Sequence, residues 1–119
     1  MIVKTFDVKV EDFITSLDKP TYAKASRTII LLRTFGNELR MPYSKSLGGN
    51  LFELRARGQR EIRIFYTFHA GEAILLHAFI KKTQNTPLRE IESARAKLKG
   101  NPTLMSQAIT SLADIHREN

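Results

Sequence analysis

The chain has 119 residues, the size of one domain, and its 42% hydrophobic and 26% charged residues are typical of a folded protein rather than a disordered one. It contains no cysteine, which excludes disulfides, thiolate nucleophiles and zinc-thiolate sites and suits a reducing compartment. No apolar run reaches the about 20 residues that span a bilayer, and the first residues lack the features of a signal peptide. The sequence therefore predicts a soluble, cytoplasmic protein that does not contact a membrane.

The first third of the chain has the periodicity of two helices. Residues 2–6 alternate weakly between apolar and polar and could form a short first strand. Asp7 is a suitable N-cap for a helix over residues 8–18, because its carboxylate can accept from the free N–H groups of the next turn. A proline break separates this helix from a second one over residues 20–35. Two helices joined so closely should form an antiparallel pair.

The pattern changes in the middle of the chain from helical to alternating. Residues 44–50 are rich in Ser, Gly and Asn and are predicted to form a loop. Three strand-like runs follow at hairpin spacing, which indicates an antiparallel meander: 51–57, 61–69 and 73–81. Thr86 then caps a helix that ends near Lys99. The predicted fold is α+β: two N-terminal helices packed on a β-meander, followed by one or two C-terminal helices.

The net charge of +7 is concentrated in one segment. Residues 40–82 carry eight basic and three acidic side chains, whereas the flanking segments are close to neutral. A strong basic excess points to a polyanionic partner such as nucleic acid. Ordinary surface positivity is the alternative, and the concentration in one segment weighs against it.

Alternation along the three strands sorts their side chains onto two faces of the sheet. The purely apolar sets must face the helices, because charged side chains there would lose their hydration. The opposite face then gathers basic and aromatic side chains: Arg55, Arg57, Arg63, His77, Lys81, Phe65 and Phe79. An open face of this kind could bind phosphates and stack bases, although a solvated sheet face can have the same composition. Arg63 should be exposed there, so Arg63→Ala should cost about 1 kcal/mol or less in stability.

No residue pattern indicates a metal site or a cofactor. The three histidines, His69, His77 and His116, lie on different predicted elements without ligand spacing, and no paired carboxylates accompany them. A phosphate-binding glycine loop and a serine nucleophile motif are also missing. Cationic side chains remain, and these can hold a phosphate and stabilise the negative charge that develops during phosphoryl transfer.

Three consecutive segments carry a family pattern: Leu51-Phe-Glu-Leu-Arg55, Ile62-Arg-Ile-Phe-Tyr66 and Leu75-Leu-His-Ala-Phe-Ile-Lys-Lys-Thr83. Thr86-Pro87 follows them before the last predicted helix. Together they resemble the RelE/HigB-like toxins of bacterial toxin–antitoxin pairs, in particular the phage-derived HigB-like branch. The resemblance covers residues 2–99. It implies a small basic protein with two helices on a curved antiparallel sheet, which enters the ribosome and cuts messenger RNA.

The resemblance also implies a metal-independent mechanism, in which the 2′-hydroxyl of the RNA attacks the adjacent phosphate. Arg63 matches the family's strand arginine that contacts the scissile phosphate, and Arg55 matches the arginine on the preceding strand. Lys81 and Lys82 match a basic pair of which one cation steadies the leaving oxygen. His77 is the group on that face suited to acid–base work.

Further residues are expected to bind RNA around these catalytic candidates: Lys45, Arg57, Arg60, Phe65 and Phe79. One departure from the family concerns the C-terminal aromatic that some relatives use in catalysis, since Leu88 stands about where it would fall. Proton transfer would then depend on His77, on a lysine or on the ribosome itself.

The implied partners are the ribosome with its messenger RNA and an antitoxin protein of helix-turn-helix type. Two alternatives stay open: a ParE-like poison of DNA gyrase, and a non-catalytic RNA-binding member of the family. Residues 1–99 are predicted to form the toxin domain and residues 100–119 an amphipathic helical extension, with one apolar face: Leu104, Ala108, Ile109, Leu112 and Ile115. The extension could pack on the core, mediate a homodimer or cover the basic face.

Overall fold

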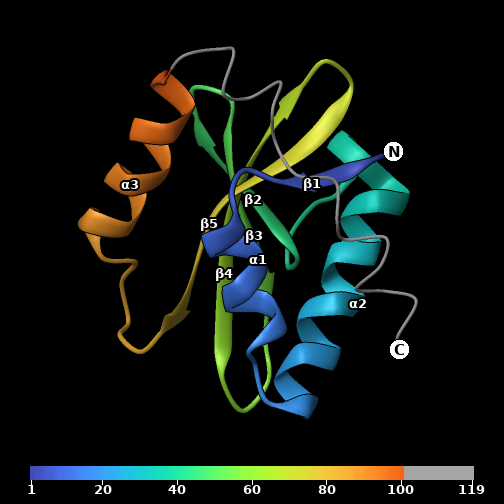
Figure 1. Ribbon diagram of the computed structural model, residues 1–119, viewed down its shortest axis with the longest axis vertical. Coiled ribbons are helices and arrows are strands. Elements are labelled where there is room, and N and C mark those ends of the chain that lie inside the picture. Colours follow the sequence, from blue (N-terminus) through green and yellow to red (C-terminus); the bar gives the residue numbers. More distant parts are fainter. Residues whose placement is uncertain (101–119) are drawn as a thin grey trace.

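A computed structural model describes residues 1–100 of the chain (Figure 1). Its helices and strands are, in order, β1 Val3–Thr5, α1 Val8–Thr15, α2 Lys19–Phe35, β2 Ser44–Gly48, β3 Leu51–Ala56, β4 Glu61–His69, β5 Glu72–Lys81 and α3 Leu88–Lys99. A short 3₁₀ turn, Gly36–Glu38, follows α2. The predicted C-terminal extension lies outside the described residues, apart from Gly100. None of the helices within residues 1–100 has the length and apolar character needed to cross a membrane.

The five strands form one mixed sheet in the order β1-β5-β4-β3-β2. β1 pairs with β5 in parallel, and the remaining neighbours are antiparallel. The molecule is α+β, but the predicted arrangement of two N-terminal helices on a three-stranded meander is wrong. The chain begins with an edge strand that the sheet incorporates beside its last strand, and a further strand, β2, extends the opposite edge.

The segment predicted as a loop, residues 44–50, contains β2. Its backbone pairs with β3, with Ser44 opposite Leu54 and Lys45 opposite Glu53. The strand is short and polar, and positive φ angles at its last residue, Gly48, and at Gly49 and Asn50 turn the chain toward β3. Local sequence therefore resembles a loop, and pairing with β3 makes it a strand.

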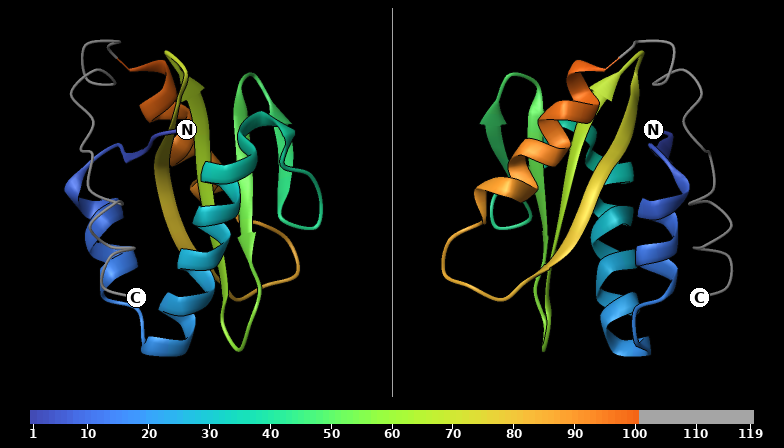
Figure 2. Two further views of the ribbon diagram at one scale, coloured as in Figure 1. Left: turned by 90° about the vertical axis from the view of Figure 1, so that its right-hand side faces the viewer. Right: turned by 60° about the vertical axis from the view of Figure 1, so that its left-hand side comes forward.

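Two helices cover one face of the sheet, and both begin at an aspartate cap (Figure 2). The Asp7 carboxylate accepts from the Val10 amide at 3.1 Å, as predicted. The Asp18 carboxylate accepts from the backbone amide and the hydroxyl of Thr21, and the hydroxyl bond is the main cause of a lowered pKa for Asp18. The buried residues of α1 and α2 form the main core with the sheet; they include Val10, Ile14, Ala25, Ile29 and Leu32.

The third helix, α3, covers the other face of the sheet and builds a second core there (Figure 2). Phe65 is fully buried in this core and Phe79 is 7% exposed, with Ala94 of α3 packed in the same cluster. The prediction that both phenylalanines lie on an open face and stack RNA bases is therefore wrong. The reason is tertiary: strand alternation assigned them to the correct face, but α3 shields that part of the face from solvent.

A bulge in β5 changes which of its side chains share a face. Phe65 pairs with His77 and Tyr66 with Leu75, so Leu76 is an extra residue in the ladder. Alternation without a bulge would put Ile74 and Leu76 on the same face as Ala78. Instead, Ile74 and Leu76 belong to the second core under α3.

Replacing Phe65 tests whether this second core stabilises the fold. Phe65→Ala removes a fully buried ring and should lower the free energy of unfolding by about 3–5 kcal/mol. Phe35→Ala is the control, since Phe35 is 50% exposed at the end of α2 and its loss should cost less than about 1 kcal/mol. Urea unfolding of both variants measures the difference. Equal, small losses would contradict the burial of Phe65 beneath α3.

Candidate nucleic-acid site

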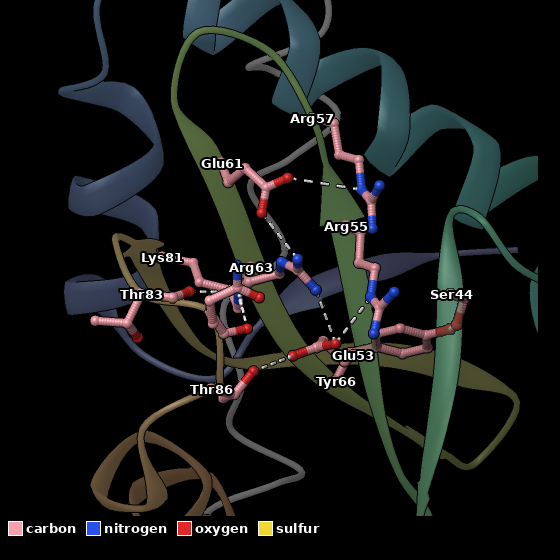
Figure 3. A network of polar contacts seen from close by, with 11 residues as sticks. Ser44, Glu53, Arg55, Arg57, Glu61, Arg63, Tyr66, Lys81, Thr83 and Thr86 are labelled. Atoms are coloured by element: carbon pink, nitrogen blue, oxygen red, sulfur yellow. Dashed lines mark hydrogen bonds and ion pairs between the residues drawn. The ribbon is translucent and has the colours of Figure 1, made fainter.

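An open groove of about 690 Å³ lies where β2, β3, β4 and the end of β5 meet the segment that leads to α3 (Figure 3). It is lined by Lys45, Arg55, Arg57, Glu61, Arg63, Lys81, Lys82, Thr83, Gln84, Asn85 and Thr86. We call it the basic groove, because six of these side chains are cationic and one, Glu61, is a carboxylate. It brings together four of the five predicted catalytic residues.

The buried carboxylate of Glu53 holds two arginines of this groove in place. Glu53 is 2% exposed, and its Oε1 accepts from Arg55 Nε at 2.9 Å and from Arg63 Nη1 at 3.0 Å. Arg55 and Arg63 stand directly opposite each other in the β3–β4 ladder, where two like charges would repel. The shared carboxylate offsets that repulsion and fixes both guanidinium groups in position (Figure 3).

Arg63 lies inside the protein rather than on its surface. The residue is 4% exposed, and its Nη2 donates to Glu61 Oε2 at 2.9 Å. β4 is a central strand, and Arg63 is flanked in the ladder by Arg55 on β3 and Phe79 on β5. The prediction of an exposed Arg63, with a small cost of Arg63→Ala, is wrong, because its two neighbours and two carboxylates enclose the side chain.

Glu61 keeps its negative charge at the edge of the groove. The hydrogen bond from Arg63 is the main cause of a pKa lowered below the usual value, and the charges of Arg63, Arg57 and Lys81 lower it further. Arg57 Nε lies 3.7 Å from the Glu61 carboxylate. Three cationic side chains, Arg57, Arg63 and Lys81, thus act on the Glu61 carboxylate. A single carboxylate among the described lining residues leaves most of the positive charge of the six cations uncompensated.

The three lysines of the groove differ in their contacts. Lys81 Nζ donates to the carbonyl oxygens of Thr83 at 2.6 Å and Gln84 at 2.7 Å, and so holds the segment before α3. Lys45 and Lys82 are exposed, and neither side chain forms a hydrogen bond or ion pair with another of residues 1–100. These two ammonium groups are therefore available to a bound anion.

β2 places Lys45 at the groove and is held there from both faces of the sheet. The hydroxyl groups of Ser44 and Tyr66 share a buried hydrogen bond of 2.5 Å, and burial raises the pKa of Tyr66 (Figure 3). On the α3 side, Arg95 donates to the carbonyl oxygens of Leu47 at 3.0 Å and Gly48 at 3.3 Å. The sequence predicted Lys45 as a binding residue but not the strand that carries it.

Besides Phe65 and Phe79, two further predicted site residues lie away from the basic groove. His77 does not line it; its Nε2 is 3.0 Å from Glu90 Oε1 of α3, and its ring stacks against both Phe65 and Phe79. Arg60 lies beside the start of α2, with Nε 3.8 Å from Asp18. The structure therefore does not bring either residue to the catalytic candidates.

Three residues at the site were not predicted from the sequence: Glu53, which pairs with two arginines of the groove, and Glu61 and Thr86, which line it. Strand alternation puts Glu53 on the same face as Arg55, and its position two residues before Arg55 is the available signal for an ion pair. Thr86 was predicted to cap α3, but the N-cap is Pro87, and the Thr86 hydroxyl instead donates to Glu53 Oε2 at 3.1 Å. The His, Asp and Glu side chains of residues 1–100 form no group of three that could hold a metal ion.

The fold and the groove define a small α+β protein with a concentrated basic site. The family model described as "Phage derived protein Gp49-like (DUF891)" matches residues 12–99, and the chain belongs to this family of toxin-like proteins. The prediction of a phage-derived, toxin-like family is confirmed at this level. A search of curated proteins finds no match.

The burial of Arg63 predicts a large stability effect. Arg63→Ala should lower the free energy of unfolding by about 3 kcal/mol or more, because it leaves the buried Glu53 carboxylate with less compensation. Arg57→Ala removes a guanidinium whose side chain is 56% exposed and should cost less than about 1 kcal/mol. Denaturant unfolding compares the two, and equal midpoints would contradict the proposed role of Arg63 in the fold.

The lowered pKa of Glu61 predicts a specific pH dependence. A carboxyl group whose folded-state pKa lies below its usual value of 4.5 contributes stability that is fully present above that pH. This contribution is lost as the pH falls through the folded-state pKa. The difference in unfolding free energy between the wild type and Glu61→Gln should therefore be largest near neutrality and shrink in acid. Urea unfolding across this range measures it, and a constant difference would contradict the assignment.

Proposed function

We propose that the protein is a toxin that cleaves RNA, as a ribosome-dependent messenger RNA endonuclease of the RelE/HigB type. One observation carries the proposal: a chain of the toxin-like Gp49-like family has a groove with six cationic side chains and one carboxylate. Such a groove matches the phosphodiester backbone of RNA in charge. The resemblance of residues 51–87 to RelE/HigB-like toxins supports the choice of RNA as substrate.

The cations of the groove would act by electrostatic stabilisation of a phosphate. In the proposed reaction the 2′-hydroxyl oxygen attacks the adjacent phosphorus, forming a cyclic phosphate and releasing a 5′-hydroxyl. Lys45, Lys82 and Arg55 line the groove, and Arg55 bonds Glu53 through its Nε, so the two ammonium groups and the Nη atoms of Arg55 would contact the phosphate oxygens. Fixed cations at developing negative charge lower the barrier because they need no reorganisation during the reaction.

Arg63 would contribute differently from the arginine implied by the family resemblance. Both of its Nη atoms already donate to carboxylates, and its side chain is 5% exposed. It would stabilise the phosphate through its charge and by holding Glu53 and Arg55 in place, rather than as the principal direct contact. The direct contacts with the phosphate are therefore assigned to Lys45, Lys82 and Arg55, which have donors that no protein group within residues 1–100 uses.

Proton transfer would depend on Lys82 and on groups outside the chain. His77 is bonded to Glu90 and does not line the groove, which weighs against it as the acid or base. The Lys82 ammonium can donate a proton to the leaving oxygen. The proton of the attacking hydroxyl would go to the ribosome or water, which suits a reaction in which the ribosome positions the substrate.

A cytoplasmic toxin of this kind requires a silencing partner. An antitoxin that presents acidic side chains to the basic groove would gain association rate from the net charge of +7. The proposed partner is therefore an antitoxin with a helix-turn-helix domain and an acidic surface or segment.

Lys82→Ala tests the nuclease proposal without disturbing the fold. Lys82 is exposed and has no hydrogen bond or ion pair within residues 1–100, so thermal melting should stay unchanged. Loss of its contact with the phosphate and leaving oxygen should reduce cleavage of ribosome-bound messenger RNA roughly ten- to a hundredfold. Primer extension on a translated message measures this rate.

The matched control is Lys9→Ala, which removes the same charge from an exposed position on α1, and it should cleave at the wild-type rate. Equal rates for the two variants would contradict the role of Lys82. If the wild-type protein leaves messages intact and cleaved DNA–gyrase complexes accumulate, the protein is a gyrase poison instead. Binding of RNA without any cleavage would favour a non-catalytic RNA-binding protein.

A further inference from the structure

A second groove of about 410 Å³ lies between α2 and β3, next to the basic groove. Its walls include the side chains of Lys24, Arg27 and Leu31 from α2 and of Tyr43 from the segment before β2. We call it the tyrosine groove. None of the predicted catalytic residues except Arg55 lines it.

The two grooves share the side chains of Arg55 and Arg57. Figure 3 shows the Arg57 guanidinium group facing Glu61, and the same side chain lines the tyrosine groove with Lys24 and Arg27 of α2. A chain that occupies the basic groove can therefore continue past these two arginines into the tyrosine groove. The shared arginines make the two sites parts of one basic track.

The tyrosine groove is more uniformly charged than the basic groove. Lys24, Arg27, Arg55 and Arg57 give it four cationic side chains, and no Asp or Glu is among the described residues that line it. Lys24 and Arg27 are exposed, and within residues 1–100 their side chains form no hydrogen bond or ion pair. Nothing in the described part of the fold uses these two charges, so a bound polyanion could contact both.

Tyr43 supplies an aromatic surface beside these charges. It is 44% exposed. Its backbone is fixed by two hydrogen bonds. Its carbonyl oxygen accepts from the Arg55 backbone amide at 2.8 Å, and its own amide donates to the Arg40 carbonyl oxygen at 3.0 Å. An exposed aromatic ring on a fixed backbone, beside several cationic side chains, is the arrangement on which single-stranded nucleic acids stack their bases.

We propose that the tyrosine groove binds the single-stranded RNA that continues from the scissile phosphate. One base stacks on Tyr43, and the flanking phosphates contact Lys24 and Arg27. The proposal extends the function proposed above and rests on it for the position of the scissile phosphate. An acidic peptide would also match the charge, but the exposed ring and the continuity through Arg55 and Arg57 favour one nucleic-acid strand across both grooves.

The first experiment measures binding of a fully 2′-deoxy-substituted oligonucleotide, which lacks the attacking hydroxyl and cannot be cut. Fluorescence anisotropy at several salt concentrations compares the wild type with Lys24→Ala/Arg27→Ala. Loss of two phosphate contacts should weaken binding and reduce the slope of log K against log salt by about 1.4, since each contact on a single strand contributes about 0.7. Alanine at these exposed helix positions should leave the fold intact.

The matched control is Lys9→Ala/Arg33→Ala, which removes two exposed charges from α1 and α2 outside both grooves. Its salt slope should stay within experimental error of the wild type. Equal reductions for the two double variants would overturn the proposal, because the effect would then come from net charge alone.

The second experiment tests stacking on Tyr43. Tyr43→Ala should weaken oligonucleotide binding about tenfold, whereas Tyr43→Phe keeps the ring and should bind like the wild type. An oligonucleotide with 2-aminopurine should lose fluorescence on binding to the wild type and Tyr43→Phe, and keep it with Tyr43→Ala. Equal binding and quenching by all three proteins would overturn the stacking contact.

Failure of this inference can be distinguished from failure of the nuclease proposal. If the wild type cleaves RNA but substitutions of Tyr43, Lys24 and Arg27 do not change oligonucleotide binding, RNA binding in the tyrosine groove is contradicted and the nuclease proposal stands. If binding depends on Tyr43 but the wild type does not cleave RNA, nucleic-acid binding in the tyrosine groove is supported and the nuclease proposal is contradicted. If Lys24→Ala/Arg27→Ala weakens only binding to ribosomes or to an acidic peptide, the substrate-strand assignment is overturned.

Discussion

The site depends on one buried interaction, in which the Glu53 carboxylate holds Arg55 and Arg63 on neighbouring strands. Two arginines directly opposite each other in a ladder would destabilise the sheet without it. A buried carboxylate is costly unless it is paired and hydrogen-bonded, and Glu53 meets this requirement with both arginines and the Thr86 hydroxyl. The same group therefore permits dense positive charge and anchors the segment that leads to α3.

The two cores confine the site to one end of the sheet. α1 and α2 cover one face, and α3 covers the other over Phe65 and Phe79 (Figure 2). Beyond α3 the basic groove stays open to solvent, although Arg63 in its wall is buried. The aromatic side chains of the basic face thus stabilise the fold, while Tyr43, which lies outside the sheet, is an exposed aromatic group beside the basic groove.

Membership of the Gp49-like family and the charge of the groove fit a toxin that acts on RNA. The cations divide into two groups with different tasks. Arg63 and Lys81 are tied to protein oxygens and maintain the site, whereas Lys45, Lys82 and part of Arg55 have donors free among the described residues. This division explains how a groove of like charges is stable before any anion binds.

Much of the local structure followed from the sequence alone. Periodicity located α1, α2, α3 and the strands β3, β4 and β5, and alternation placed Glu53, Arg55 and Arg63 on one face, because the backbone pleat decides this residue by residue. The parallel pairing of β1 with β5 depends on a partner distant in the chain, and β2 becomes a strand only through its pairing with β3, because its own residues are typical of a loop. The burial of Arg63, the cover over Phe65 and the bulge at Leu76 likewise depend on how distant elements pack. Sequence by itself determined which side chains share a face along β3 and β4; the tertiary structure decided the faces of β5 around its bulge and which side chains meet solvent, because solvent exposure is a property of the assembled layers.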